Sequence, residues 1–354
     1  MVSLRLTQLC TAMAEQGLKA ELHGEDRLIR AVNTLDAACE GEISFLSNPK
    51  YTKNLKSTAA SAVIVADDTP VPHRLSAIRC SDPYAAVTVA IIEICGHKTH
   101  PVWGVSDGAW IDPSAKLGRD ANIAPGATVA AGVTLGDRCT LYPGCYLANG
   151  VALGDDCVLH PNVVIYNDCV LGDRVTIHAG SVIGEDGLGY APHHDKWLKI
   201  PQIGRTVLGD DVEIGANCTV DRATLGQTEI GDGTKFGNMV VIGHGTKVGP
   251  HCLFVGQVGV AGSVTIGRHV TLAGQVGVKG HITIEDNVRV GGKSGVWDDL
   301  SEGAEVFGSP AVPVRKAIKA MSVLQSLPDW VRRVKDLERQ VALLQRRLEP
   351  VDRA

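Results

Sequence analysis

A six-residue period runs through the middle of the chain and limits the folds open to it. Over residues 111–183 a large apolar residue occupies every sixth position without exception. The frame resumes over 208–220, slips by four residues, and continues over 230–296. Each unit of six has room for one short strand and one turn, so the sequence predicts a solenoid of short strands.

A second position of the repeat, four places after the large apolar residue, takes small or β-branched residues. Six of the ten cysteines occupy it: Cys139, Cys145, Cys157, Cys169, Cys218 and Cys252. We therefore expect these thiols to fill space as small hydrophobes. The sequence contains no CxxC pair, and we predict neither a metal site nor redox chemistry.

Three units of six close a triangular coil of eighteen residues. Stacked strands lie about 4.8 Å apart, so residues eighteen apart in an unbroken run stand above one another. Turn residues fall at the third and fourth places, counted from the large apolar residue. In the first half of the repeat glycine is frequent at the fourth place, where a turn needs positive φ, and absent from the third.

In the later run of the repeat, over residues 230–296, glycine occupies the third place. It does so five times: Gly256, Gly262, Gly274, Gly280 and Gly292. Turns earlier in the chain form without glycine at the third place. We therefore interpret these five glycines as positions where the missing side chain leaves room for a groove. A change of turn type is the alternative.

His244 begins one of the glycine columns, since Gly262 and Gly280 follow it at steps of eighteen. His281 is next to the last of them, at roughly 10 Å from His244 if coils stack at the usual spacing. A histidine beside cleared space is a candidate general base. The main-chain N–H of a glycine one coil above it could meet a developing oxyanion.

Two other pairs of histidines in the repeat serve as a comparison for His244 and His281. His160 and His178, and likewise His251 and His269, are eighteen apart and are expected to form surface ladders. Neither pair lies in a column with third-place glycine, so neither is favoured as a catalytic group.

The flanking segments lack the repeat. The N-terminal hundred residues indicate a mixed α/β unit, in which Phe45, Asn48, Lys50 and Tyr51 fall within seven positions. Two rings can sandwich a base, an amide can bind its edge, and a lysine can meet a phosphate. A core ring followed by a polar loop is the simpler alternative.

The frame also breaks between Ile183 and Leu208, and a loop of this length on a rigid scaffold favours contact with a ligand or a neighbouring subunit. After the repeat, residues 314–327 and 329–348 are expected to be helical. The second helix carries a coiled-coil seam, which indicates oligomerisation: Val334, Leu337, Val341, Leu344 and Leu348.

The net charge of −5 argues against nucleic acid as a partner. Neither a signal peptide nor an apolar stretch long enough to cross a membrane is evident, so we expect no transmembrane segment and a cytoplasmic location.

Specific motifs add a resemblance over nearly the full chain. They are NPKY in the N-terminal unit, IGEDGLGYAP and KIPQIGR in the loop, DRATLGQT at the frame slip, IGHG around His244, and KGH ending at His281. The chain resembles the UDP-3-O-(3-hydroxyacyl)glucosamine N-acyltransferases of lipid A biosynthesis, which are hexapeptide-repeat acyltransferases. The resemblance implies a homotrimer of left-handed parallel β-helices, mainly β, with an N-terminal mixed α/β domain and C-terminal helices. We expect domains at 1–104 (uridine-binding), 105–308 (catalytic) and 309–354 (helical).

The resemblance also implies roles for individual residues. His244 is the expected base, Gly262 N–H the oxyanion donor, and His281 a second histidine that helps hold the reacting groups. The expected substrate contacts are Phe45 and Tyr51 around the uracil, with Asn48, Lys50, Asn238, Gly256, Gly274, Gly280 and Gly292. The expected carrier-protein contacts are Lys293, Arg315, Lys316 and Lys319.

The implied reaction moves a 3-hydroxyacyl chain from acyl carrier protein to the 2-amine of UDP-3-O-acylglucosamine, giving UDP-2,3-diacylglucosamine. The phosphopantetheine arm belongs to the donor, and no tightly bound cofactor is expected. Two departures from the family pattern, Gly237-Asn238 and His244-Gly245, remove the acid and the amide that would orient His244 locally. The alternatives are O-acylation of UDP-N-acetylglucosamine by another hexapeptide enzyme and a non-catalytic trimeric scaffold.

Overall fold

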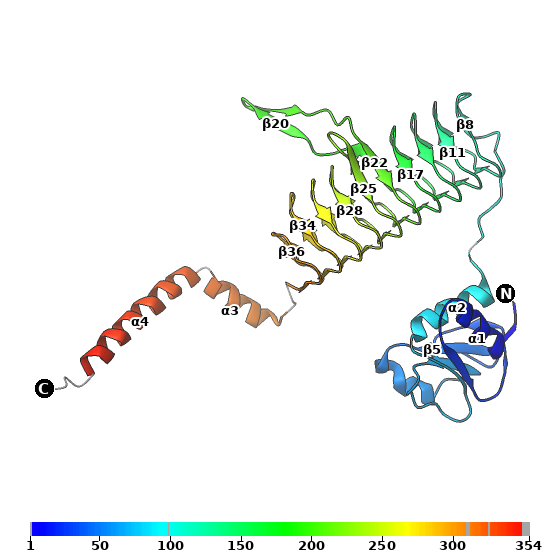
Figure 1. The fold of residues 1–354 in the computed structure, drawn as a ribbon, viewed down its shortest axis with the longest axis horizontal. Coiled ribbons are helices and arrows are strands. Elements are labelled where there is room, and N and C mark those ends of the chain that lie inside the picture. The colour runs from blue at the N-terminus through cyan, green and yellow to red at the C-terminus, as the bar shows by residue number, and fades with distance from the viewer. Residues whose placement is uncertain (1, 98, 309–311, 325, 349–354) are drawn as a thin grey trace. The chain divides into compact units, whose positions relative to one another are not determined.

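The computed structural model describes residues 2–97, 99–308, 312–324 and 326–348. The chain forms two compact units, Met1–Pro101 and Val102–Ala354, and each is described by itself. The second unit contains the repeat, which winds into coils of short strands (Figure 1). Three parallel sheets run along these coils, one on each face of a triangular prism.

Sheet A contains β8 Trp110–Ile111, β10 Thr128–Val129, β13 Tyr146–Leu147, β16 Val164–Ile165, β19 Val182–Asp186, β24 Thr219–Arg222, β27 Val241–Ile242, β30 Gly259–Val260, β33 Gly277–Val278 and β36 Gly295–Val296. Sheet B contains β11 Thr134–Leu135, β14 Ala152–Leu153, β17 Val170–Leu171, β22 Arg205–Leu208, β25 Gln227–Ile230, β28 Lys247–Val248, β31 Thr265–Ile266 and β34 Thr283–Ile284. Sheet C contains β9 Asn122–Ile123, β12 Thr140–Leu141, β15 Val158–Leu159, β18 Thr176–Ile177, β23 Glu213–Ile214, β26 Lys235–Phe236, β29 Leu253–Phe254, β32 Thr271–Leu272, β35 Arg289–Val290 and β37 Glu305–Val306.

The strand register confirms the eighteen-residue coil. Val129 pairs with Leu147 in parallel, and Val260 pairs with Val278. Where the frame slips, the partners are further apart in sequence, as in Val220 with Ile242. The four extra residues are therefore absorbed within one coil, and the stack continues in register above them.

The prism core confirms the two inward positions. Side chains of both slots form one buried cluster along the coils, and Leu141 and Cys139 are fully buried in it. Burial raises the pKa of Cys145 and of Cys252 to about 11. These thiols therefore stay protonated near neutral pH and pack as apolar groups.

The loop between Ile183 and Leu208 leaves the coils as a hairpin (Figure 1). Its strands are β20 Tyr190–His193 and β21 Lys196–Lys199, paired antiparallel. Lys199 Nζ lies 3.1 Å from Asp186 Oδ2 at the base of the hairpin. Large apolar side chains of the hairpin are exposed, with Leu188 83% and Trp197 72% accessible.

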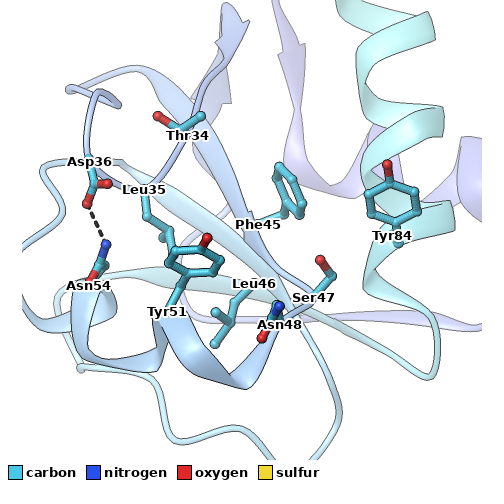
Figure 2. A pocket seen from close by; sticks show the side chains of 10 residues that line it. All are labelled: Thr34, Leu35, Asp36, Phe45, Leu46, Ser47, Asn48, Tyr51, Asn54 and Tyr84. Carbon is cyan, nitrogen blue, oxygen red and sulfur yellow. Dashed lines mark hydrogen bonds between the residues drawn. The ribbon is translucent and has the colours of Figure 1, made fainter. Parts of the chain in front are cut away.

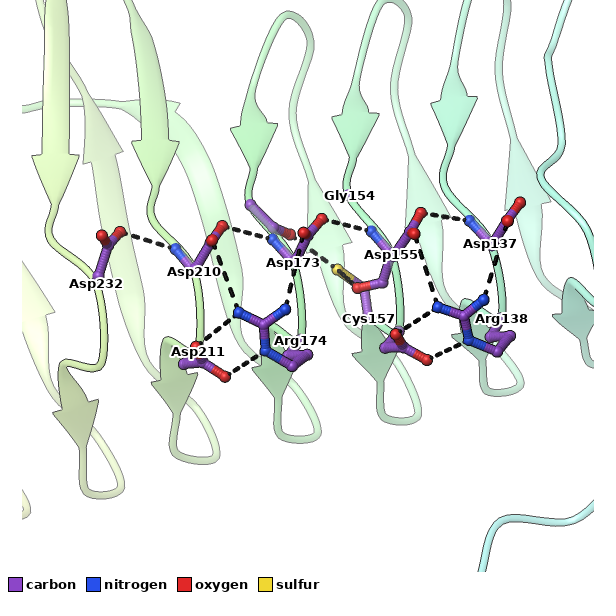
Figure 3. A network of polar contacts seen from close by, with 12 residues as sticks. Asp137, Arg138, Gly154, Asp155, Cys157, Asp173, Arg174, Asp210, Asp211 and Asp232 are labelled. Carbon is purple, nitrogen blue, oxygen red and sulfur yellow. Dashed lines mark hydrogen bonds and ion pairs between the residues drawn. The ribbon is translucent and has the colours of Figure 1, made fainter.

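An aspartate ladder follows the prism corner between sheets B and C (Figure 3). At each step the main-chain N–H at a third place donates to the aspartate at the third place one coil further on. Asp137 donates to Asp155 and Asp155 to Asp173, both at 2.8 Å, and Asp210 donates to Asp232 at 2.9 Å. The carboxylate of each third-place aspartate thus accepts a hydrogen bond from the main chain of the turn one coil earlier.

Two arginines form ion pairs with aspartates beside this ladder. These ion pairs predict that the stability of the fold decreases at acid pH. Arg138 and Arg174 pair with Asp156 and Asp211 at 2.7 Å, and these hydrogen bonds lower the pKa of both carboxyls. A lowered folded-state pKa gives stability that is present above the unfolded pKa of about 4 and is lost as pH falls below it.

We expect the melting temperature to drop between about pH 5 and pH 2. The drop should be smaller in an Arg138→Gln/Arg174→Gln variant, because its aspartates lose their pKa shifts. Calorimetry of both proteins across this range measures the difference. Parallel pH curves would contradict the assignment.

The N-terminal unit is an α/β fold. Its main sheet has the order β2-β7-β6-β5-β4, with β2 Ala20–His23, β4 Ala31–Val32, β5 Glu42–Leu46, β6 Ala62–Val65 and β7 Ser76–Cys80. The short strands β1 Leu4–Arg5 and β3 Leu28–Ile29 form a separate pair. The helices are α1 Leu6–Glu15, α2 Pro83–Cys95 and the 3-10 helix η1 Pro49–Lys56. The two α-helices pack together against the sheet, with Leu9 and Ala90 in the shared core.

Two helices follow the coils, α3 Val314–Leu324 and α4 Leu327–Leu348. The predicted seam of α4 is exposed at Val334, Leu337, Val341 and Leu344, which are 49–56% accessible. Among the described residues no helix is long and apolar enough to cross a membrane. Residues 309–311 and 349–354 of the predicted C-terminal extension lie outside the description.

Candidate functional site

The five third-place glycines lie on two corners of the prism. Gly256, Gly274 and Gly292 follow Asn238 where sheet C turns into sheet A, after β26, β29, β32 and β35. Gly262 and Gly280 follow His244 where sheet A turns into sheet B. The two columns therefore border one face of the prism, the one formed by sheet A.

The outward positions of sheet A between these columns also hold glycine, a feature that the sequence analysis missed. They are Gly259, Gly277 and Gly295, each paired with the next in parallel register. A Cβ on Gly259 or Gly277 would meet no atom within 4 Å. Packing does not demand glycine there, so the bare face is an open surface. The signal was present in the sequence as glycine at the place before each large apolar residue.

His244 is held between two glycines from different coils. A Cβ on Gly262 would lie 2.7 Å from His244 Nε2, and a Cβ on Gly187 would lie 2.6 Å from His244 Cβ. Both distances are shorter than real Cβ contacts, so a side chain at either position would displace His244. The half-buried imidazole therefore lies beside Gly262.

The main-chain N–H of Gly262 has no hydrogen-bond acceptor among the described residues. In the aspartate ladder the capping acceptor would come from the third place one coil further on, which here is Gly280. Gly280 thus supplies no cap, and the N–H remains available beside the His244 ring. Such a pairing of a free N–H with an imidazole can serve proton transfer and oxyanion binding together.

His281 lies one coil beyond Gly262 and is exposed, and its main-chain N–H donates to the Gly262 carbonyl at 3.3 Å. The structure thus brings His244, Gly262, Gly280 and His281 together on one corner.

The neighbouring column forms a groove along the other edge of the bare face. Gly256 and Gly274 are its floor, and Lys293 lies at one end of it. A row of polar side chains runs alongside, in which Gln275 Nε2 donates to Gln257 Oε1 at 2.5 Å. Asn238 also lines the groove while its Oδ1 caps the Ala216 N–H at 2.9 Å. Arg315, Lys316 and Lys319 lie on α3.

A separate cavity of about 400 Å³ lies in the N-terminal unit (Figure 2). Phe45 from β5, Tyr51 from η1 and Asn48 line it. The Phe45 ring also faces Tyr84, from the start of α2, at a centroid distance of 6.3 Å. Lys50 is not among the lining residues, and its main-chain N–H donates to Asn48 Oδ1 at 3.0 Å.

Tyr84 and the pair Asp36–Asn54 were missed in the sequence: Tyr84 and Asp36 come from other segments, and Asn54 follows Tyr51 in η1. Asn54 Nδ2 donates to Asp36 Oδ1 at 2.6 Å on the cavity wall (Figure 2). The cavity thus combines three aromatic rings with amide and carboxylate groups, a mixture that suits a heteroaromatic ring with polar edges.

Asp221, in β24, is the acidic group beside His244. Burial, followed by the charge of Glu185, raises the pKa of the Asp221 carboxyl to about 6, with the main-chain N–H of His244 acting in the opposite direction. In the described part of the chain, no three His, Cys, Asp or Glu side chains converge as metal ligands.

The repeat model described as bacterial transferase hexapeptide (six repeats) matches residues 114–149 and 150–185. The solved UDP-N-acetylglucosamine O-acyltransferase from Moraxella catarrhalis is similar over 69% of this chain and 92% of its own, at 24% identity and a TM-score of 0.47. The coils described above and the repeat model agree that this part of the chain is a parallel β-helix built from hexapeptide repeats.

The N-terminal unit makes the assignment more specific. Residues 26–91 match the family model described as UDP-3-O-(3-hydroxymyristoyl) glucosamine N-acyltransferase, LpxD. The UDP-3-O-acylglucosamine N-acyltransferase of Syntrophotalea carbinolica is 55% identical over 88% of this chain and 90% of its own. That of Oleidesulfovibrio alaskensis is 56% identical over 93% and 95%. The chain belongs to the family of UDP-3-O-acylglucosamine N-acyltransferases.

Proposed function

We propose that this enzyme transfers a 3-hydroxyacyl chain from acyl carrier protein to the 2-amine of UDP-3-O-acylglucosamine, giving UDP-2,3-diacylglucosamine for lipid A. The observation that carries the proposal is the imidazole of His244 lying beside Gly262, whose main-chain N–H has no acceptor in the part of the chain that the structure describes. The names of the relatives supply the substrates, and the corner supplies the chemistry for an acyl transfer.

The reaction follows from these two groups. The amine nitrogen attacks the thioester carbonyl carbon, and His244 removes a proton from that nitrogen. The carbonyl oxygen becomes an oxyanion that accepts a hydrogen bond from Gly262 N–H. The C–S bond then breaks, the electron pair leaves on sulfur, and the imidazolium returns its proton to the departing thiolate. His281 helps to hold the reacting groups, and the buried cysteines take no part.

The donor in this proposal is the phosphopantetheine arm of acyl carrier protein, and no other cofactor is required. The groove over Gly256 and Gly274 supports it, since its floor lacks side chains on two successive coils, and Gly292 continues the same column. Lys293, Arg315, Lys316 and Lys319 are proposed contacts for the acidic carrier protein. Acyl chain or pantetheine would lie in the groove, with Asn238 and Gly280 at the acceptor sugar.

A homotrimer is the proposed assembly. The exposed α4 seam and the apolar hairpin around Trp197 support it, because both present apolar surface without a partner in the described chain. The same proposal divides the chain into a uridine-binding domain at 1–104, a catalytic domain at 105–308 and a helical extension at 309–354.

The N-terminal cavity is proposed to bind the uracil between Phe45 and Tyr51, with Asn48 at its edge and Lys50 nearby. We expect Tyr51→Ala to raise KM for the UDP-sugar about 10-fold or more, because stacking of a base on an aromatic ring contributes about 1–3 kcal/mol to binding. Because this contact is equal in ground state and transition state, kcat should stay within about 2-fold. Steady-state kinetics with varied UDP-sugar measure both constants. A fall in kcat at unchanged KM would contradict a uridine site.

Acceptor choice tests the function as a whole. The enzyme is incubated with a 3-hydroxyacyl carrier-protein thioester and either UDP-3-O-acylglucosamine or UDP-N-acetylglucosamine. We expect turnover with the free amine and none with the acetylated sugar. Turnover of UDP-N-acetylglucosamine would identify an O-acyltransferase, and no turnover with either would favour a scaffold.

A further inference from the structure

The turn residues Gly237 and Gly245 carry no polar side chain that could orient the ring of His244. Main chain approaches this histidine on two sides instead. A Cβ on Gly187 would lie 2.6 Å from Cβ and 3.1 Å from Cδ2 of His244, and a Cβ on Gly262 would lie 2.7 Å from Nε2. The place of the imidazole therefore depends on how firmly these two stretches of main chain are held.

The two stretches are attached to the prism in different ways. Gly262 is part of a regular coil, and its carbonyl accepts a hydrogen bond from the main chain of His281 at 3.3 Å. Gly187 belongs to the loop that leaves the coils as a hairpin (Figure 1). It comes directly after Asp186, the last residue of β19, which pairs with Arg222 of β24 across a register shift. Gly187 therefore keeps its place only if the first residues of the loop are fastened to the coils.

The side chain of Arg222 makes this attachment. It is buried, and its Nε donates to the Gly184 carbonyl at 2.7 Å while Nη2 donates to the Asn167 carbonyl at 2.8 Å. Gly184 begins the loop root, residues 184–186, and Asn167 follows β16, one coil earlier. One guanidinium thus joins the loop root to a turn of the preceding coil. Because guanidinium donors have a fixed planar geometry, the two bonds also fix the direction in which the loop leaves.

The loop root has two further contacts. The φ of Gly184 is +82°, and a Cβ there would overlap the Sγ of Cys169, so this main chain packs directly on the apolar core. On the returning strand of the hairpin, Lys199 Nζ lies 3.1 Å from Asp186 Oδ2. The loop is therefore held at its root, three residues before Gly187 reaches His244.

We propose that Arg222 is a positioning residue for His244: its guanidinium fastens the loop root to the coils and so keeps Gly187 against the histidine. The inference rests on the proposed acyl transfer. Arg222 is buried and bonds to main-chain carbonyls, so it acts on the reaction only through the loop. A displacement of about 1 Å near a reacting group can cost about 100-fold in rate, so a released loop is visible in kcat.

The test is a double-mutant cycle measured in kcat. Arg222→Met removes both donors and keeps an unbranched stem, and Gly187→Ala places a methyl group against His244. Steady-state kinetics with 3-hydroxyacyl carrier protein and UDP-3-O-acylglucosamine are measured for the full-length wild type, both single variants and the double variant, together with melting curves.

The matched control is Thr234→Val, on the corner between sheets B and C. Its buried hydroxyl also joins main chain of successive coils, donating to the Gly249 carbonyl at 3.0 Å and accepting from the Cys252 N–H at 3.1 Å. It has no contact with the loop. Thr234→Val should lower the melting temperature and leave kcat unchanged, which separates a loss of stability from a loss of position.

We expect Arg222→Met to lower kcat about 10- to 100-fold, with both KM values within about 3-fold. Gly187→Ala should lower kcat about 100-fold in the wild-type background, where the loop cannot yield to the methyl group. In the Arg222→Met background the released loop can yield, so Gly187→Ala should lower kcat by no more than about a further 3-fold. Full activity of Arg222→Met, or losses that multiply in the double variant, would overturn the inference.

A second substitution covers the case in which Arg222→Met does not fold. Arg222→Lys keeps the buried charge but lacks the fork of donors that reaches both carbonyls. The same cycle is then run with Arg222→Lys, and we expect a smaller loss of kcat with the same lack of additivity. Multiplying losses in this cycle would also overturn the inference.

Failure of the proposed function gives a different result. An inactive wild-type protein would reject the acyl transfer itself. An active wild-type protein, together with an inactive His244→Ala variant and a fully active Arg222→Met variant, would reject the role of Arg222 alone.

Discussion

His244→Ala is expected to lower kcat about 10³-fold or more, while KM for both substrates changes little. A positioned general base contributes about 10²–10⁴-fold, and here the same imidazole also returns the proton to the departing thiolate. The residue lies at a turn and its ring lies beside Gly262, outside the apolar core cluster. Loss of the ring therefore opens no cavity in the apolar core, and the coils should keep their melting temperature.

The matched control is His269→Ala. His269 stacks on His251 at 5.2 Å on the corner between sheets B and C, away from the glycine columns. It should retain full activity in the same thioester-consumption assay. Near-normal turnover of His244→Ala would remove the proposed base, and a loss of activity in His269→Ala would show that the assay responds to general damage.

Gly262→Ala is the second large effect, with an expected fall in kcat of about 100-fold, as for a displaced base. The new Cβ would lie 2.7 Å from Nε2 and 2.9 Å from Cε1 of His244, so the ring must leave its place. The three nearest atoms all belong to the His244 side chain. The damage should therefore concern the position of the base and spare the coil.

A double variant tests whether glycine at position 262 is needed for the place of the His244 ring or for the turn itself. In His244→Ala/Gly262→Ala the conflict is gone, so the stability cost of Gly262→Ala should disappear relative to His244→Ala alone. Melting curves of the four proteins in this cycle measure the coupling. If Gly262→Ala destabilises both backgrounds equally, the glycine serves the turn and not the histidine.

The repeat made most of the prism predictable. Large apolar residues at every sixth position became strands in parallel register, and Cys139 and Cys145 became buried core residues. The reason is physical: a coil has a fixed length, so position in the repeat determines whether a side chain points inward. The same arithmetic placed His244, Gly262 and Gly280 in one column.

The other features of the site depend on contacts between segments that are not related by the six-residue repeat. Gly187 approaches His244 from the hairpin loop, where a step of eighteen no longer applies. Tyr84 joins Phe45 and Tyr51 through the fold of the N-terminal unit. Lys50, although adjacent to Tyr51, does not line that cavity, because η1 turns its side chains in different directions.

The most direct measurement is the mass spectrum of the product formed from 3-hydroxyacyl carrier protein and UDP-3-O-acylglucosamine, before and after mild alkaline hydrolysis. Alkali cleaves esters and leaves amides. We expect one added 3-hydroxyacyl group that survives the treatment, formed by the wild-type enzyme and not by His244→Ala. An added group that alkali removes, or an equal yield from the two proteins, would contradict amide formation by this histidine.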